Sequence, residues 1–169
     1  YDPNAPVPCN YRYIRSDLCD LLPTPDFGNF DVFVCLSTIE HFGMDAYDEG
    51  HGIQRHYDVL GMRRAWELLK VGARAYVTVP MGSVFREVWG HWRIYDLRAL
   101  QERLVQDFFL DGVFCLVAAP CEINGVKREP GSSITAEEVL GYDDEKNPHI
   151  SSLLLMHKVE VQRRAPDGR

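Results

Sequence analysis

The chain has 169 residues, a hydrophobic fraction of 46% and a charged fraction of 25%, which suit one soluble globular domain with a real core. Its formal net charge of −7 argues against a general nucleic-acid binder, because such proteins need a basic face for the phosphates. No apolar run approaches the length of a membrane span and no secretory signal is visible. We therefore expect a cytoplasmic protein with neither a membrane nor a nucleic-acid partner.

The cysteines indicate reduced thiols. Five of them occur without any C-x-x-C pair, and Cys35 and Cys115 lie inside apolar runs, where cysteine behaves as a small core residue. We expect neither a disulfide framework nor a structural metal site.

The N-terminal third predicts two strands and a long loop. Residues 11–17 alternate aromatic or aliphatic side chains with arginine, which predicts a short strand ending at Asp17. Residues 31–36 are almost continuously apolar and rich in β-formers, which indicates a strand covered on both faces. Residues 42–56 are rich in glycine and histidine without periodicity, which predicts a loop of the kind that carries active-site residues.

The middle of the chain predicts helix, strand, loop and helix in that order. Apolar residues at helical spacing follow the long loop, and Gly72 stands where a helix C-terminal glycine belongs. Residues 73–79 predict a second buried strand, and residues 81–95 an aromatic-rich loop. Asp96 can cap a helix whose apolar side carries Leu97, Leu100 and Leu104.

The C-terminal third predicts two strands, 112–119 and 151–161, joined by a long polar connection with a possible capping box at 135–138. These strands lack a clear crossover helix, so they can be antiparallel and make the edge of the sheet mixed. The order of elements predicts an α/β fold, Rossmann-like and doubly wound, with a mostly parallel sheet and an antiparallel last strand. One domain would span residues 1–161, with a tail at 162–169.

Four segments, in this order and spacing, resemble the class I S-adenosylmethionine-dependent methyltransferases. They read SDLCDLL, FDVFVCLSTIEHFG, MRRAWELLKVGARAYVTVPMG and HWRIYDLRALQERL, and the last is similar to an uncharacterised methyltransferase-like subgroup with a His-Arg-Ile-Tyr stretch. The resemblance covers residues 11–119 and, by pattern, 151–161. It implies S-adenosylmethionine as the cofactor and methyl transfer to an oxygen or nitrogen of a small-molecule or glycan-like acceptor.

The resemblance also implies a first strand that ends in a glycine-rich loop, yet no G-x-G-x-G occurs in this chain. By position that strand would precede Tyr1, so we expect the N-terminal part of the fold to be missing here and to be completed by an upstream segment or a partner chain. The alternative is a non-catalytic methyltransferase-like module that acts in an assembly. A second alternative is a different nucleotide-using enzyme with the same architecture, but this sequence contains no phosphate-binding loop that would support it.

Cofactor contacts are implied for five residues that follow strands, since ligands of open α/β sheets bind at the carboxyl ends of the strands. Asp2 matches an acid on the cofactor ribose. Asp17 would accept a hydrogen bond from the adenine amino group, with Leu18 packed on the ring. Leu36 and Ser37 would line the methionine part. The alternatives are structural: Asp17 as a helix cap, Leu36 as a core residue and Ser37 as a loop residue.

His41 is the candidate catalytic residue, because histidine is the natural general base near neutral pH. A Glu-His pair is common at this place in the resembled family, among members with different substrates. The alternative is therefore a structural histidine held by the loop backbone.

Two clusters are predicted to contact the acceptor. The loop at 45–58 contains His51 and His56 among carboxylates, but its spacing matches no metal signature, so we expect a substrate loop and no metal. His91, Arg93 and Tyr95 follow the second buried strand, and Arg93 could pair bidentately with a carboxylate or phosphate. Alternatively, Arg93 and Tyr95 lock their loop to the body of the domain.

Overall fold

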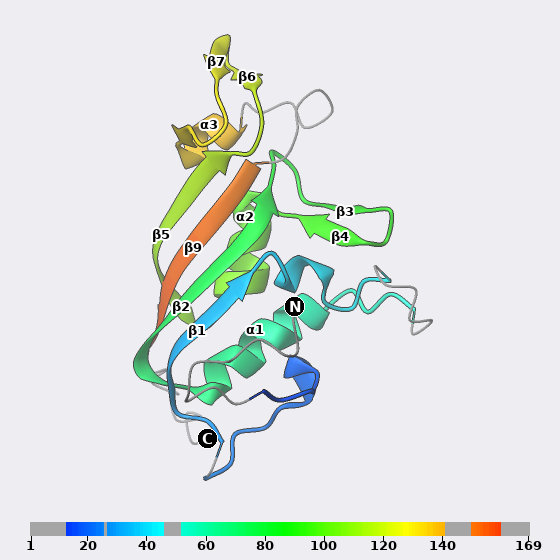
Figure 1. The fold of residues 1–169 in the computed structure, drawn as a ribbon, viewed down its shortest axis with the longest axis vertical. Helices are drawn as coiled ribbons and strands as arrows, with labels where there is room; N and C mark the ends of the chain where they lie inside the picture. Colours follow the sequence, from blue (N-terminus) through cyan, green and yellow to red (C-terminus); the bar gives the residue numbers. More distant parts are fainter. Residues whose placement is uncertain (1–12, 26, 46–51, 141–149, 160–169) are drawn as a thin grey trace, which may run out of the picture.

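The computed structural model describes residues 13–25, 27–45, 52–140 and 150–159. Within them a five-stranded sheet has the order β1-β2-β9-β5-β8 (Figure 1). Its strands are β1 Phe30–Leu36, β2 Leu69–Met81, β5 Phe108–Val117, β8 Ser133–Ile134 and β9 Ile150–Lys158. No helix in this part of the chain is both long enough and apolar enough to cross a membrane.

The remaining elements are short, apart from one helix. The helices are η1 Leu18–Asp20, η2 Ile39–His41, α1 Tyr57–Leu68, α2 Leu97–Ala99 with its π-helical continuation η3 Leu100–Val105, and α3 Ala136–Leu140. Two hairpins, β3 Arg86–Val88 with β4 Trp92–Ile94 and β6 Cys121–Ile123 with β7 Val126–Arg128, extend from the sheet (Figure 1).

The sheet has the predicted mixture of directions. β1 and β2 are parallel, and β9 is antiparallel to both of its neighbours, β2 and β5. Three of the four long strands therefore point the same way and the last runs against them, which confirms the predicted fold class. The edge of the sheet is mixed, as predicted, since the edge strand β8 is antiparallel to β5, and β9 itself is inserted between β2 and β5.

One face of the sheet is the core. Ala75 and Val77 of β2 and Leu154 and Met156 of β9 are fully buried on this face. Met62 of α1, together with residues of α2 and η3, belongs to the same buried cluster. The helices therefore cover this face, as the apolar periodicity predicts.

The other face of the sheet is exposed. Val32, Val34 and Leu36 of β1 are 52%, 58% and 60% exposed, and Phe114 of β5 is 56% exposed. The prediction that residues 31–36 are covered on both faces is therefore wrong within the described residues, because α1, α2 and η3 all pack on the core face.

Several local predictions are confirmed. The side chain of Asp96 accepts a hydrogen bond from the backbone N–H of Ala99 at 2.6 Å and so caps α2. Thr135 and Glu138 exchange side-chain to backbone hydrogen bonds, which is the predicted capping box at the start of α3.

Three local predictions are wrong. Residues 13–17 contain no strand. Gly72 lies inside β2 at a φ of +80°, because α1 already ends at Leu68. The expected loop at 81–95 contains the β3–β4 hairpin instead.

The four described cysteines, Cys19, Cys35, Cys115 and Cys121, are free thiols. Burial raises the pKa of Cys35 and of Cys115 to about 11. These two thiols act as small core residues, as their apolar surroundings predict.

Candidate functional site

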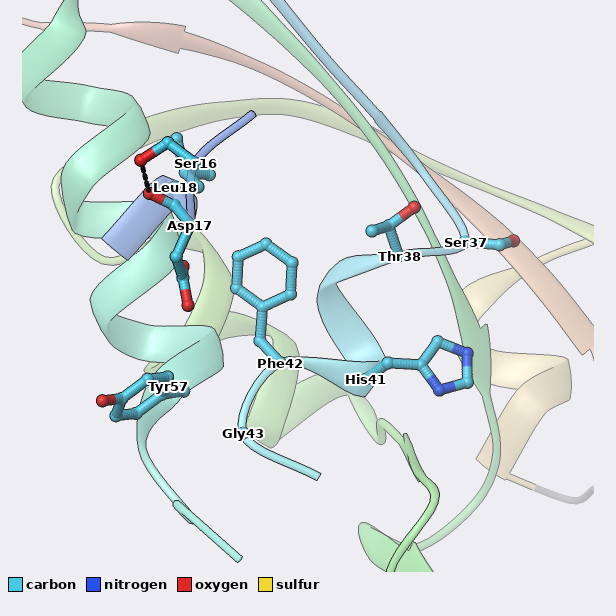
Figure 2. Close-up of a pocket in the computed structure, with 9 residues that line it drawn as sticks. All are labelled: Ser16, Asp17, Leu18, Ser37, Thr38, His41, Phe42, Gly43 and Tyr57. Atoms are coloured by element: carbon cyan, nitrogen blue, oxygen red, sulfur yellow. Dashed lines mark hydrogen bonds between the residues drawn. The ribbon is translucent and has the colours of Figure 1, made fainter. Parts of the chain in front are cut away.

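A pocket of about 470 Å³ lies at the carboxyl end of β1, between η1, η2 and the start of α1 (Figure 2). It brings together four of the predicted site residues from separate segments, namely Asp17, Leu18, Ser37 and His41. The full lining is Ser16, Asp17, Leu18, Ser37, Thr38, His41, Phe42, Gly43 and Tyr57.

A sharp turn after β1 creates the floor of this pocket. Ser37 has a φ of +44°, which is unfavourable for a residue with a side chain. The turn is held because the Ser37 N–H donates to the backbone oxygen and to Oγ1 of Thr78, and the Thr38 hydroxyl donates to the Leu36 carbonyl. Such strained backbone is concentrated at functional sites, where the surrounding structure maintains it.

Glycine is required where the two ends of the 42–56 loop meet. A Cβ atom on Gly43 would lie 2.3 Å from the Gln54 carbonyl oxygen and 2.7 Å from the Tyr57 Cβ, and the residue has a φ of +66°. The Gln54 N–H donates to the Gly43 carbonyl at 2.6 Å. This close approach places Tyr57, at the start of α1, against the pocket.

Asp17 combines the two roles that the sequence left open. Its Oδ1 accepts a hydrogen bond from the Cys19 N–H at 2.8 Å, so the residue caps η1. The same residue lines the pocket. Because a carboxylate has about four acceptor positions, the cap leaves capacity to bind an exocyclic amine.

The backbone holds the imidazole of His41. Nδ1 lies 2.8 Å from the His91 carbonyl oxygen, and Nε2 lies 3.9 Å from Glu40 Oε1. A carbonyl oxygen only accepts, so Nδ1 carries the hydrogen and Nε2 is the basic nitrogen of the neutral ring. The Nδ1 side of His41 is therefore held by the loop backbone, as in the structural alternative. The ring of His41 also lines the pocket.

Glu40 is a buried carboxyl group next to His41. It is 2% exposed, and its Oε2 has no hydrogen-bond partner among the described residues. Burial raises its pKa above the usual value. The protonated, neutral form is therefore favoured more than in a free glutamate.

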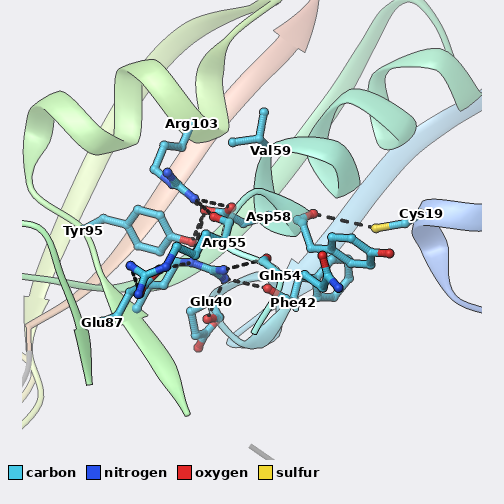
Figure 3. A network of polar contacts seen from close by, with 12 residues as sticks. Cys19, Glu40, Phe42, Gln54, Arg55, Asp58, Val59, Glu87, Tyr95 and Arg103 are labelled. Atoms are coloured by element: carbon cyan, nitrogen blue, oxygen red, sulfur yellow. Dashed lines mark hydrogen bonds and ion pairs between the residues drawn. The ribbon is translucent and has the colours of Figure 1, made fainter. Parts of the chain in front are cut away.

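Arg93 and Tyr95 lie in a buried polar network rather than in the pocket. Figure 3 shows Tyr95 and its partner Asp58 in this network. Arg93 is fully buried and donates to the backbone carbonyls of Phe42 and Gln54. Tyr95 is also fully buried and donates from its hydroxyl to Asp58 Oδ2 at 2.9 Å. In the described residues both side chains are buried and hold their loop to the domain, which favours the structural alternative for Arg93 and Tyr95 over the predicted substrate contacts.

Asp58 is the centre of that network. It is fully buried, and its two oxygens accept hydrogen bonds from Nε and Nη2 of Arg103 at 2.8 and 2.7 Å. Arg93 Nε lies 3.8 Å from the same carboxylate. The network thus joins α1, β4 and η3 on the covered side of the sheet, which positions the segment that leads into the pocket.

The remaining predicted residues lie elsewhere. Asp2 and His51 are outside the described residues. His56 precedes α1 and lines a separate cavity of about 420 Å³. His91 is exposed on the β3–β4 hairpin and contributes its backbone oxygen to the site, and Leu36 lies on the exposed face of the sheet.

Sequence reasoning missed several lining residues, among them Thr38, Phe42, Gly43 and Tyr57. The position of Thr38, directly after Ser37 at the end of an apolar strand, could have predicted its place in the pocket. No local sequence pattern predicts Phe42, Gly43 and Tyr57 as lining residues, because the close approach of residue 43 to residue 54 brings them together.

The strand order, the antiparallel β9 inside the sheet and the pocket at the carboxyl end of β1 define a class I methyltransferase-like α/β fold. One solved structure supports this fold. The crystal structure of the [4+2]-cyclase SpnF matches with a TM-score of 0.50 and 17% identity, over 85% of this chain and 54% of that chain.

N-methyltransferase NodS from Bradyrhizobium japonicum WM9, in complex with S-adenosyl-L-homocysteine, matches with a TM-score of 0.44 and 11% identity, over 86% of this chain and 53% of that chain. The chain therefore spans about half the length of these solved structures, and at such identities the likeness shows the fold alone. No protein-family model matches the sequence, and no curated protein shows a significant match.

Proposed function

We propose that this chain is part of an S-adenosylmethionine-dependent methyltransferase that acts on an oxygen or nitrogen of a small-molecule or glycan-like acceptor. One observation carries the proposal: Asp17, Leu18, Ser37 and His41, which the resemblance implies for cofactor binding and catalysis, line one pocket at the carboxyl end of β1. Ligands of open α/β sheets bind at this end of the strands.

The pocket fits one end of the cofactor. Asp17 offers a carboxylate acceptor for the adenine amino group, and Leu18 and Phe42 offer apolar surface for the ring. Bound S-adenosylmethionine would supply the activated methyl group. The 169 residues contain no glycine-rich turn for its methionine end, where a side chain would prevent close approach.

His41 would accept the proton of the acceptor. Its Nδ1 contact with the His91 carbonyl selects the tautomer in which Nε2 is basic. The larger contribution to rate would come from holding the acceptor in line with the methyl group, since positioning alone can supply several kcal/mol of the barrier.

The second candidate is a non-catalytic methyltransferase-like module. It is favoured because the sequence contains no G-x-G-x-G, the glycine-rich turn that would contact the methionine end of the cofactor. SpnF, a [4+2]-cyclase, illustrates that the fold by itself does not determine methyl transfer.

Calorimetric titration with S-adenosylhomocysteine tests the proposal. We expect the 169-residue chain to bind more weakly than micromolar, because two or three hydrogen bonds of about 0.5–1.5 kcal/mol each fall short of the ~8 kcal/mol of a micromolar complex. Micromolar binding by this chain alone would mean that other residues replace the glycine-rich turn. The natural-length polypeptide should bind at micromolar levels or tighter, and failure of both proteins to bind at millimolar ligand contradicts the proposal.

A matched pair of variants locates the site. Asp17→Asn keeps a good cap for η1 but replaces one acceptor oxygen with a donor, so we expect the dissociation constant of the natural-length polypeptide to rise about tenfold. Asp20→Asn changes an exposed carboxylate on the same turn that does not line the pocket, and should leave binding unchanged. Equal behaviour of the two variants would place the cofactor elsewhere.

A further inference from the structure

A separate cavity of about 420 Å³ lies where the segment before α1, the strand β3 and the helix η3 come together. This volume is in the range of small-molecule sites. The described residues that line it are Arg55, His56, Phe85, Arg86, Glu87 and Arg103. Three arginines therefore gather at one cavity of a chain whose formal net charge is −7.

The positive charge at this cavity exceeds the negative charge. Glu87 is the one carboxylate among the described lining residues, so the three arginines leave an excess of two positive charges. Counting the fully buried Asp58 and Arg93 leaves this excess unchanged, because their charges are opposite. Asp96 accepts the Phe85 N–H at 3.1 Å, but it also caps α2 and does not line the cavity. Since arginine stays protonated in proteins, the excess is permanent.

Arg103 is held in place by the protein itself. Its Nε and Nη2 donate to Asp58 at 2.8 and 2.7 Å, and Nη2 also donates to the Arg55 carbonyl. The guanidinium lies over the Phe85 ring, 5.1 Å from the ring centroid. Nη1 makes none of these hydrogen bonds, so it is the nitrogen that can donate to an anion in the cavity. A donor that is already fixed loses little conformational entropy when a ligand binds.

Arg55 shares its carboxylate partner with another arginine. Its Nη1 lies 2.9 Å from Glu87 Oε2 (Figure 3), and Glu87 Oε1 lies 3.8 Å from Arg93 Nε. The Arg55 side chain is 70% exposed, so this ion pair contributes little to stability. The Arg55 guanidinium is therefore available to a ligand without loss of the fold.

Three arginines around one cavity suit a tetrahedral anion. A guanidinium binds phosphate through paired N–H donors, and several guanidinium groups can reach different oxygens of one phosphate. His56 adds a further possible donor to the lining. The next residue, Tyr57, lines the pocket at the carboxyl end of β1. A ligand that binds through a phosphate in this cavity therefore lies beside that pocket.

We propose that this cavity binds the phosphate group of a small-molecule ligand, with donors from Arg55, Arg86 and Arg103. Phe85 offers apolar surface to the part of the ligand next to the phosphate. Glu87 opposes the anion and limits its affinity. The inference does not depend on methyl transfer, because it rests on the charges and the shape of this cavity.

Titration of the 169-residue chain with inorganic phosphate tests the proposal. With the ionic strength held constant by chloride, we expect saturable shifts at millimolar phosphate in the amide NMR signals of Arg55, Arg86 and Arg103. Acetate at the same concentration should give smaller shifts, because it carries a single negative charge. No saturable shift at these amides, or a larger effect of acetate than of phosphate, overturns the proposal.

A matched set of arginine variants separates a site from general attraction. Arg55→Gln and Arg86→Gln should each raise the dissociation constant for phosphate about fivefold or more, because each removes a charged donor from the cavity. Arg98→Gln removes the same charge from an exposed pair with Glu102 that does not line the cavity, and should leave binding unchanged. Equal weakening by all three variants overturns the proposal.

Glu87→Gln gives a test of opposite sign. The variant keeps the shape of the side chain and removes the negative charge that opposes the anion, so phosphate should bind several-fold more tightly. This expectation stands even if the loss of an arginine prevents folding. Unchanged or weaker binding of phosphate by the folded Glu87→Gln variant overturns the proposal.

Discussion

The two faces of the sheet are built from the same kind of residues but differ in burial. Along β9, Leu154 is fully buried while its neighbour Leu153 reaches the other face, which no described helix covers. Along β1, Cys35 is buried while Val34 is 58% exposed. The apolar residues of these strands thus allow helices to pack on either face of the sheet. Which face is buried depends on where the neighbouring helices lie.

The largest expected effect is the difference in stability between removing a buried carboxylate on the core face and removing a partly exposed one on the other face. Asp58→Ala should lower the free energy of unfolding by about 3–5 kcal/mol, because it removes the buried carboxylate that accepts two hydrogen bonds from Arg103 and leaves Arg93 with Glu87 as its one carboxylate neighbour. Asp111→Ala removes a partly exposed pair with His157 and should cost about 0–1 kcal/mol. Urea denaturation of the 169-residue chain measures both, and similar losses would contradict the comparison.

A matched leucine pair tests the packing directly. Leu154→Ala should cost about 2–5 kcal/mol of unfolding free energy, because it leaves a cavity in the core. Leu153→Ala should cost several-fold less in the 169-residue chain, since that side chain lies on the uncovered face. Equal losses for the two variants, measured by urea denaturation, would contradict the difference in packing between the two faces.

The smallest expected effect concerns the buried carboxyl beside the pocket. The pKa of Glu40 is raised above 4.5, so above that pH the native state keeps a proton that the unfolded state has released. The stability contributed by this proton is lost as pH rises through the native-state pKa. Glu40→Gln does not titrate, so its unfolding free energy relative to the original protein should increase with pH in this window.

Denaturant unfolding between about pH 4 and pH 8 checks this sign. Glu122→Gln, at an exposed position on β6, serves as the control and should follow the unmodified protein throughout. A Glu40→Gln difference that is flat or falls with pH would show that the carboxylate is compensated in the native state.

Much of the site was predictable because one rule relates it to the fold. Ser37 and His41 follow an apolar strand, so the carboxyl-end rule for α/β sheets places them at the ligand-binding end. Asp17 was placed there by a predicted strand that residues 13–17 do not form, yet it lines the same pocket. Arg93 and Tyr95 were ambiguous in the sequence, since the same Arg-Ile-Tyr stretch suits either a ligand or a buried carboxylate. Asp58, some 35 residues earlier, resolves the ambiguity.

The sequence by itself determined the elements that depend on neighbours along the chain. These include the α1 helix, the Asp96 cap and the Thr135–Glu138 capping box, because helical periodicity and capping hydrogen bonds act within a few residues. Only the tertiary structure decided that β9 inserts between β2 and β5, that Arg93 is buried and that Val34 is exposed. These outcomes depend on contacts between segments far apart in the chain, and a local pattern of apolar and polar residues does not specify which partner a face or a charge will meet.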